Sequence, residues 1–100
     1  MTTRQIQDIQ NRLQKLRQQI NEIGPIMRGT VVVIGTRNKQ PYFSVNQNGR
    51  TRLIYLGKQR EKVARTYAAN HKKLLQLVDK ITILNMTLLK NDAHYKVAFK

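Results

Sequence analysis

Apolar residues recur at alternating spacings of three and four along the first part of the chain. The positions are Ile6, Ile9, Leu13, Leu16, Ile20 and Ile23, and nearly every residue between them is polar or charged. Two apolar positions in every seven form the narrow seam of a coiled coil. The pattern predicts a helix over residues 2–23 that ends at Gly24-Pro25, because Pro disfavours the helical conformation in the residue before it. An amphipathic helix lying on a globular core is the alternative interpretation.

Between residues 29 and 56 the pattern changes to short runs of β-branched and aromatic residues. The runs cover residues 30–34, 41–45 and 51–56, and such residues favour strands. Asn48-Gly49 lies between the last two runs and predicts a two-residue hairpin turn. The turn sets the predicted pairs, which are Gln47 with Arg50, Val45 with Arg52, Phe43 with Ile54, and Tyr42 with Tyr55.

This pairing places different side chains on the two faces of the hairpin. One face carries Phe43, Val45, Ile54 and Arg52, and the other carries Tyr42, Tyr55, Leu53 and Ser44. Because both faces are partly apolar, we expect one to lie on the helices and the other on a partner.

Residues 58–90 predict a second and longer helix. Apolar residues alternate at spacings of four and three from Val63 to Leu88, with a second apolar stripe beside them. Folded back against the first helix, this helix would leave about eleven residues uncovered at its end, residues 80–90. We therefore expect an oligomer interface at Ile81, Leu84, Met86 and Leu88, most simply in a homodimer, or with a protein partner. In the alternative, the tail folds back over this segment.

Together these elements predict an α+β fold in a single domain, residues 1–100. It is an antiparallel two-helix coiled-coil hairpin with a small three-stranded antiparallel β-sheet inserted at one end. Asn70 lies in the predicted seam, where a buried polar residue sets helix register. The tail, residues 91–100, predicts either a short strand or disorder.

The charge of the chain narrows the class of partner. Among 100 residues, 19 are Lys or Arg and 5 are Asp or Glu, a net charge of +14. Residues 24–62 hold eight basic side chains against Glu61, a net charge of +7. This imbalance favours a nucleic acid, because a basic β-ribbon contacts phosphates and tyrosines stack on bases. The predicted binding residues are Arg28, Arg37, Lys39, Arg50, Arg52, Lys58, Arg60, Lys62, Tyr42 and Tyr55. The alternative is a basic surface that is merely solvated.

Groups for catalysis or metal binding are sparse. The chain has no Cys, two His and five scattered carboxylates, whereas catalytic and metal sites need such groups to converge. We expect no enzymatic activity, no metal site and no cofactor. With no signal-peptide core and no apolar run of bilayer length, the sequence also predicts a soluble cytoplasmic protein that does not enter a membrane.

Several short motifs resemble a known family. Gly24-Pro25, Gly29, Pro41-Tyr42 and the predicted hairpin, across residues 20–90, are similar to small bacterial proteins classed as a domain of unknown function. Members are often found near transposases in mobile elements. The family carries cysteines where this chain has residues 35–40, so its metal-binding implication does not carry over. The resemblance implies a mobile-element context without a mechanism.

The predicted function is that of a non-enzymatic nucleic-acid-binding protein, with DNA favoured over RNA. It would bind through a basic β-hairpin tip and serve as an accessory or regulatory factor of a mobile element. The main alternative is an interaction or inhibitor protein whose basic tip docks on an acidic protein. Adsorption of the second helix to an anionic membrane ranks lower, because the charge is concentrated elsewhere.

Overall fold

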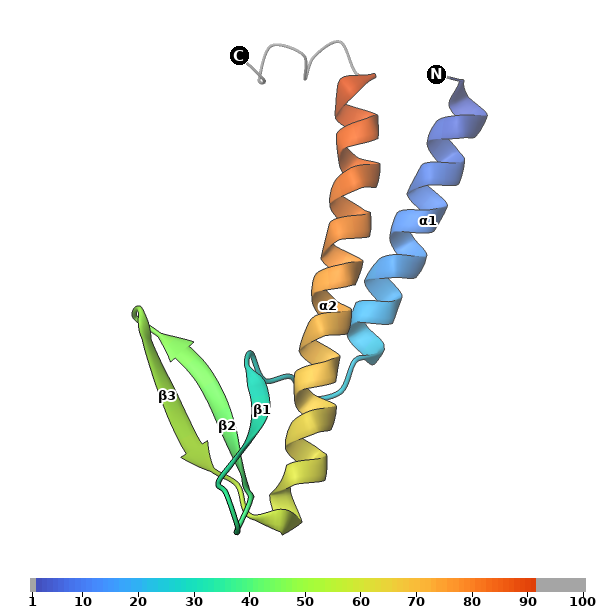
Figure 1. Cartoon of the computed structure of the whole chain (residues 1–100). Helices are drawn as coiled ribbons and strands as arrows, with labels where there is room; N and C mark the ends of the chain where they lie inside the picture. Colours follow the sequence, from blue (N-terminus) through green and yellow to red (C-terminus); the bar gives the residue numbers. More distant parts are fainter. Residues whose placement is uncertain (1, 92–100) are drawn as a thin grey trace. The chain divides into compact units, whose positions relative to one another are not determined.

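The computed structural model describes residues 2–91, which form two helices and one three-stranded antiparallel sheet (Figure 1). In chain order the elements are α1 (Thr3–Glu22), β1 (Thr30–Ile34), β2 (Gln40–Gln47), β3 (Arg50–Tyr55) and α2 (Lys58–Lys90). The predicted α+β class and element order are confirmed. Apart from Asn91, the predicted tail lies outside the described residues.

The chain divides into two compact units. The β unit is Gly24–Lys73, which comprises the sheet and the first half of α2. The helical unit consists, within the described residues, of 2–23 and 74–91. It comprises α1 and the second half of α2.

The sheet is a meander with β2 in the centre. Phe43 pairs with Ile54 and Tyr42 pairs with Tyr55, which confirms the predicted hairpin register. Asn48 has a φ of 54° and Gly49 a φ of 78°. A two-residue turn between right-twisted strands needs a positive φ at both central positions, which Asn and Gly adopt most readily.

The core of the β unit lies between the sheet and α2. Phe43 and Val45 project from β2 and pack with Leu56, Ala64 and Ala68. The two alanines are one helical turn apart on the same side of α2. Their small side chains let the helix approach the Phe43 ring, which is only 5% exposed.

Gly29 is required where the chain enters β1. A Cβ atom at this position would lie 2.5 Å from the Ser44 carbonyl oxygen and 2.6 Å from the Phe43 ring. Only a residue without a side chain fits, so Gly29 lets β1 pair closely with β2 over the core.

The segment that follows α1 is held by hydrogen bonds to α2. The Asn70 side chain donates to the Pro25 carbonyl oxygen at 2.9 Å, and the Met27 N–H donates to the Tyr67 carbonyl oxygen at 3.1 Å. Asn70 therefore anchors the segment that leads into the sheet. The prediction that Asn70 sets the register between the two helices was wrong, because Asn70 contacts the segment after α1 and not α1 itself.

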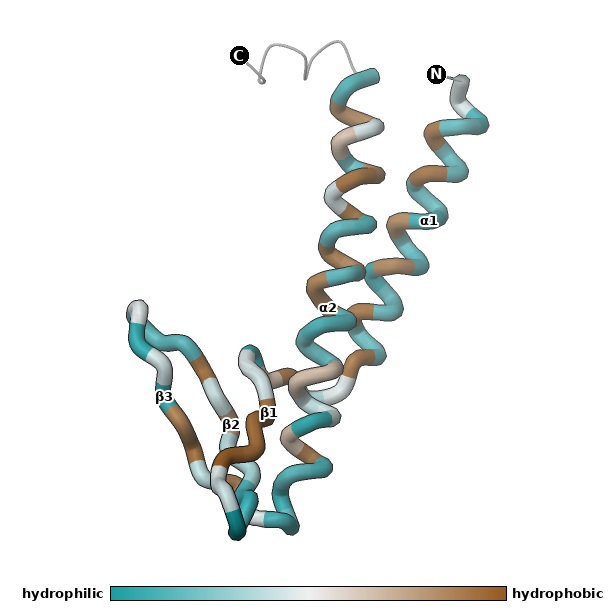
Figure 2. Tube along the Cα trace, in the orientation of Figure 1, coloured by the Kyte–Doolittle hydropathy of each residue, from teal (hydrophilic) through white to brown (hydrophobic). Residues whose placement is uncertain are grey.

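In the helical unit, α1 runs antiparallel to the second half of α2 (Figure 1). Figure 2 shows apolar positions recurring along α1 between hydrophilic ones. The predicted seam residues of α1 from Ile9 to Ile20 are half-buried, and no residue of α1 is fully buried. Leu77 of α2, 3% exposed, is the one buried apolar residue of this unit within residues 2–91. Thr2 begins α1 with a capping box, in which its side chain accepts from the Gln5 N–H and its own N–H donates to the Gln5 side chain.

The predicted overhang at the end of α2 is wrong. Gln5 and Asp8 of α1 line one groove together with Asn91, so the start of α1 lies beside the end of α2. The additional length of α2 is its first half, where Ala64 and Ala68 are covered by the sheet. Helix lengths alone predict the wrong end as the overhang, because they do not show that the sheet covers the first half of α2.

Candidate nucleic-acid interface

Positive charge is concentrated in the β unit. Residues 24–73 contain eleven Lys and Arg but a single acid, Glu61, which gives this unit +10 of the chain's +14. Arg65 forms an ion pair with Glu61 at 2.8 Å, the one ion pair found in residues 2–91. Like charges crowded in this way repel one another and attract a polyanion.

The predicted binding cations form two groups, and the first lies at the start of β2. Tyr55 at the end of β3 pairs with Tyr42 near the start of β2, so α2 begins beside the β1–β2 loop (Figure 1). This arrangement brings two segments that are distant in sequence to the same end of the sheet, and the two segments carry five cations. We call them the loop–helix cations: Arg37, Lys39, Lys58, Arg60 and Lys62.

The second group, the hairpin cations, lies at the other end of β2 and consists of Arg28, Arg50 and Arg52. The Arg28 guanidinium donates to the Asn46 carbonyl oxygen at 2.8 Å. Arg50 pairs with Gln47 across the strands, and Arg52 donates to the Gln47 side chain at 3.1 Å. The rise of β2 separates the two groups by about 23 Å. The ten predicted residues therefore do not form one cluster at the hairpin tip.

One face of the sheet points away from α2 and carries no charge. Residues of the three strands alternate between this outer face and the core face. By register, the outer face contains Thr30, Val32, Ile34, Gln40, Tyr42, Ser44, Asn46, Thr51, Leu53 and Tyr55. Of the two predicted hairpin faces, the one with Tyr42, Tyr55, Leu53 and Ser44 is this outer face, and the one with Phe43 and Val45 faces α2. The sequence did not reveal the contribution of β1, because the 35–40 loop has no turn signal that sets its register.

Two tyrosines occupy the outer face, and their rings are held in place. The Tyr42 and Tyr55 rings meet edge to face, with centroids 5.5 Å apart and planes at 67°. The Tyr55 hydroxyl donates to the Gln40 side chain at 3.1 Å. Even so, Tyr55 is 52% exposed and its neighbour Leu53 is 51% exposed.

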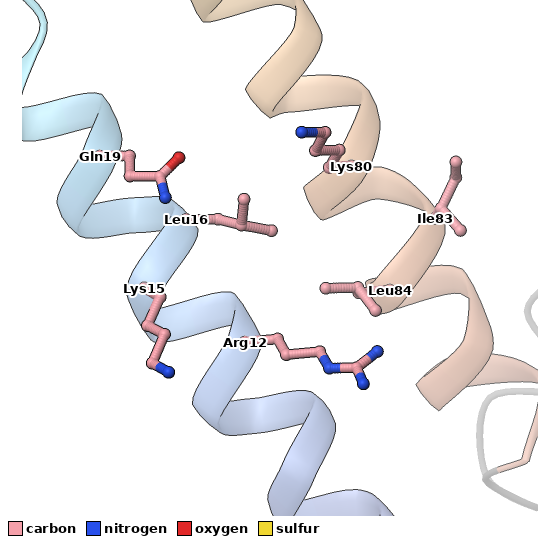
Figure 3. Close-up of a pocket in the computed structure, with 7 residues that line it drawn as sticks. All are labelled: Arg12, Lys15, Leu16, Gln19, Lys80, Ile83 and Leu84. Atoms are coloured by element: carbon pink, nitrogen blue, oxygen red, sulfur yellow. The ribbon is translucent and has the colours of Figure 1, made fainter.

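A groove in the helical unit provides a contrasting surface. It has a volume of about 420 Å³ and is lined by Arg12, Lys15, Leu16, Gln19, Lys80, Ile83 and Leu84. Figure 3 shows Leu16 and Leu84 pointing toward one another across it, whereas Ile83 points away. Three of the four predicted interface residues, Ile81, Leu84 and Leu88, are half-buried, whereas Met86 is 42% exposed.

Two further features were sought in residues 2–91, a cluster of metal ligands and a membrane-spanning helix. No group of three or more His, Asp or Glu side chains there is placed to hold a metal ion. Neither of the described helices combines the length and the apolar character needed to cross a bilayer.

Comparison with models of known families, with curated proteins and with solved structures finds no match to this chain. The resemblance to the small bacterial family stays a prediction.

Proposed function

We propose that this is a non-enzymatic nucleic-acid-binding protein whose β unit contacts the phosphate backbone. The observation that supports this proposal is a net charge of +10 on residues 24–73 with one internal ion pair. Phosphates neutralise such a surface, and release of their counterions drives binding. Phosphate contacts do not read bases, so the proposal includes binding to many sequences. A role in a mobile element rests on the sequence resemblance alone.

Fluorescence anisotropy with labelled duplex DNA, single-stranded DNA and RNA over a salt series tests this function. If about six to eight cations contact phosphates, the logarithm of the duplex affinity falls with the logarithm of salt concentration with a slope of about −5 to −7. Absence of binding to all three at low salt overturns the proposal and favours docking on an acidic protein.

Charge-reversal variants localise the contact. Arg50→Glu with Arg52→Glu changes the hairpin cations, and we expect at least about a tenfold loss of affinity and a salt slope shallower by about two. Arg4→Glu with Arg17→Glu is the matched control, because it changes the net charge equally on exposed positions of α1. Equal losses in both variants would show adsorption by overall charge and would contradict a site in the β unit. Circular dichroism checks that both variants remain helical.

The helical unit supports a second proposal, association of two copies through α2. Leu75, Val78, Thr82 and Met86 recur at helical spacing and are all exposed, and they form a stripe without charge, the α2 stripe. In a dimer with two-fold symmetry, the same stripe of each copy contacts the stripe of the other copy. In a chain of net charge +14, two copies meet most favourably where neither presents a cation. Of the four interface residues predicted from the sequence, only Met86 belongs to the α2 stripe. Ile81, Leu84 and Leu88 are half-buried on the side of α2 that faces α1 and are not part of this interface.

Light scattering tests this association. We expect the wild type to be a dimer and Val78→Asp to be monomeric, because the new charge would be buried in the interface. Ile83→Asp is the control, since Ile83 is 64% exposed and is not one of the four residues of the α2 stripe. A monomeric wild type, or equal loss of dimer in both variants, overturns the proposal.

A further inference from the structure

The outer face of the sheet has no partner in the β unit. On the core face, Phe43 and Val45 are covered by Ala64 and Ala68 of α2. On the other face Ile34, Leu53 and Tyr55 are each close to half exposed. An uncharged face with apolar and aromatic residues, in a unit of net charge +10, indicates a ligand that is flat and apolar in one part and anionic in another.

The two tyrosines present rings whose orientation is already set. Tyr55 is restrained by its hydrogen bond to Gln40 and by the edge-to-face contact with Tyr42. Rings that are ordered before binding lose little conformational entropy when a ligand stacks on them. Stacking on a base is available to any sequence, because every base has a π-face.

The cations do not lie on this face: by register Arg50 and Arg52 share the core face with Phe43 and Val45, whereas the loop–helix cations lie at the end of β2 nearest Tyr42 and Tyr55. The loop–helix cations are at one end of β2 and the hairpin cations at the other, about 23 Å apart at the rise of a strand. A strand of nucleic acid whose bases lie over Tyr42 and Tyr55 can place its phosphates at the loop–helix cations, because both are at the same end of β2.

A double helix does not suit this arrangement. Its bases are stacked on one another, and it offers phosphates and polar groove edges to a protein. The apolar outer face would then gain no contact, whereas unpaired bases expose the flat surfaces that aromatic side chains bind.

We propose that the outer face is a stacking platform for the unpaired bases of single-stranded nucleic acid, with Tyr42 and Tyr55 as the stacking residues. This inference rests on the proposed function and specifies its substrate class. Leu53 and Val32 supply the apolar floor beside the rings.

The test compares two single strands of equal length, an oligothymidylate and an abasic strand with the same phosphates. Tyr55→Ala is expected to weaken oligothymidylate binding about tenfold and to leave binding of the abasic strand unchanged. Tyr55→Phe keeps the ring and is expected to retain the affinity. Ile34→Ala is the matched control, an apolar outer-face residue without a π-system, and is expected to change the affinity less than about threefold.

Intrinsic fluorescence gives a second readout without a label. The chain has four Tyr and no Trp, so its emission comes from tyrosine. Oligothymidylate is expected to quench this emission in the wild type and to quench it less in Tyr55→Ala, whereas the abasic strand leaves it unchanged.

The outcomes separate the two proposals. If both strands bind equally and Tyr55→Ala changes neither affinity, the platform is refuted while phosphate binding stands. If Tyr55→Ala weakens both strands equally, the residue acts on the fold and the platform is again refuted. If neither strand nor a duplex binds at low salt, the proposed function itself is refuted.

Discussion

The two units of this protein differ in how much apolar surface they bury and in how much charge they carry. Of the buried apolar side chains found in residues 2–91, Leu77 alone belongs to the helical unit and all the others belong to the β unit. The β unit also carries +10 of the net charge. A packed core offsets the mutual repulsion of crowded cations, so the charged unit is also the one with a core of its own.

The helical unit carries less charge and buries less apolar surface. Every apolar residue of α1 remains at least partly exposed, and helices of this kind take most of their stability from packing rather than from intrinsic propensity. We infer that the helical unit gains stability from a partner, which the proposed association through the α2 stripe would supply.

The largest expected effect is in the core of the β unit. Phe43→Ala removes the ring at its centre, and we expect a loss of about 3–5 kcal/mol in the free energy of unfolding. Leu53→Ala on the outer face is the control, because its side chain is half exposed, and should cost about 1 kcal/mol or less. Urea denaturation followed by circular dichroism measures both. Similar losses would mean that the outer face contributes to a core.

A smaller effect is expected where β1 enters the sheet. Gly29→Ala forces a Cβ atom against the Ser44 carbonyl and the Phe43 ring, and should cost about 1–3 kcal/mol. Gly24→Ala is the matched glycine, since its added Cβ would meet only the Asn70 amide at 3.4 Å. It should change stability by about 0.5 kcal/mol or less. The same denaturation measurement compares them, and equal costs would contradict the close approach at Gly29.

The anchor between α2 and the segment after α1 is expected to contribute less. Asn70→Ala removes the hydrogen bond to the Pro25 carbonyl and should cost about 1 kcal/mol. Asn70→Asp has nearly the same shape but no N–H to donate, so it should be at least as destabilising. Thermal unfolding measures both variants. An unchanged melting temperature in Asn70→Asp would show that the segment is held by other contacts.

The smallest effect is expected at the start of the helical unit. Thr2→Ala removes the capping oxygen that accepts from the Gln5 N–H and should destabilise α1 by about 0.5–1 kcal/mol. Amide hydrogen exchange should quicken in the first turn of α1, while β2 stays protected. Thr2→Ser keeps the oxygen and serves as the control. Faster exchange in β2 as well would mean that the two units unfold together.

Local features of the sequence determined the elements and the hairpin. Spacings of three and four placed α1 and α2, and Asn48-Gly49 set the pairing of Phe43 with Ile54, as the structure confirms. These features are predictable because backbone sterics and side-chain periodicity act over a few residues.

Tertiary structure alone decided which surfaces those elements form. It placed the sheet on the first half of α2, added Val32 and Ile34 to the outer face, and separated Arg50 and Arg52 from Lys58 by the length of β2. These arrangements depend on contacts between residues that are distant in sequence. The contacts form because small residues such as Gly29, Ala64 and Ala68 let the elements approach one another. Periodicity carries no information about which distant surfaces fit, because fit is a property of volumes brought together by the fold.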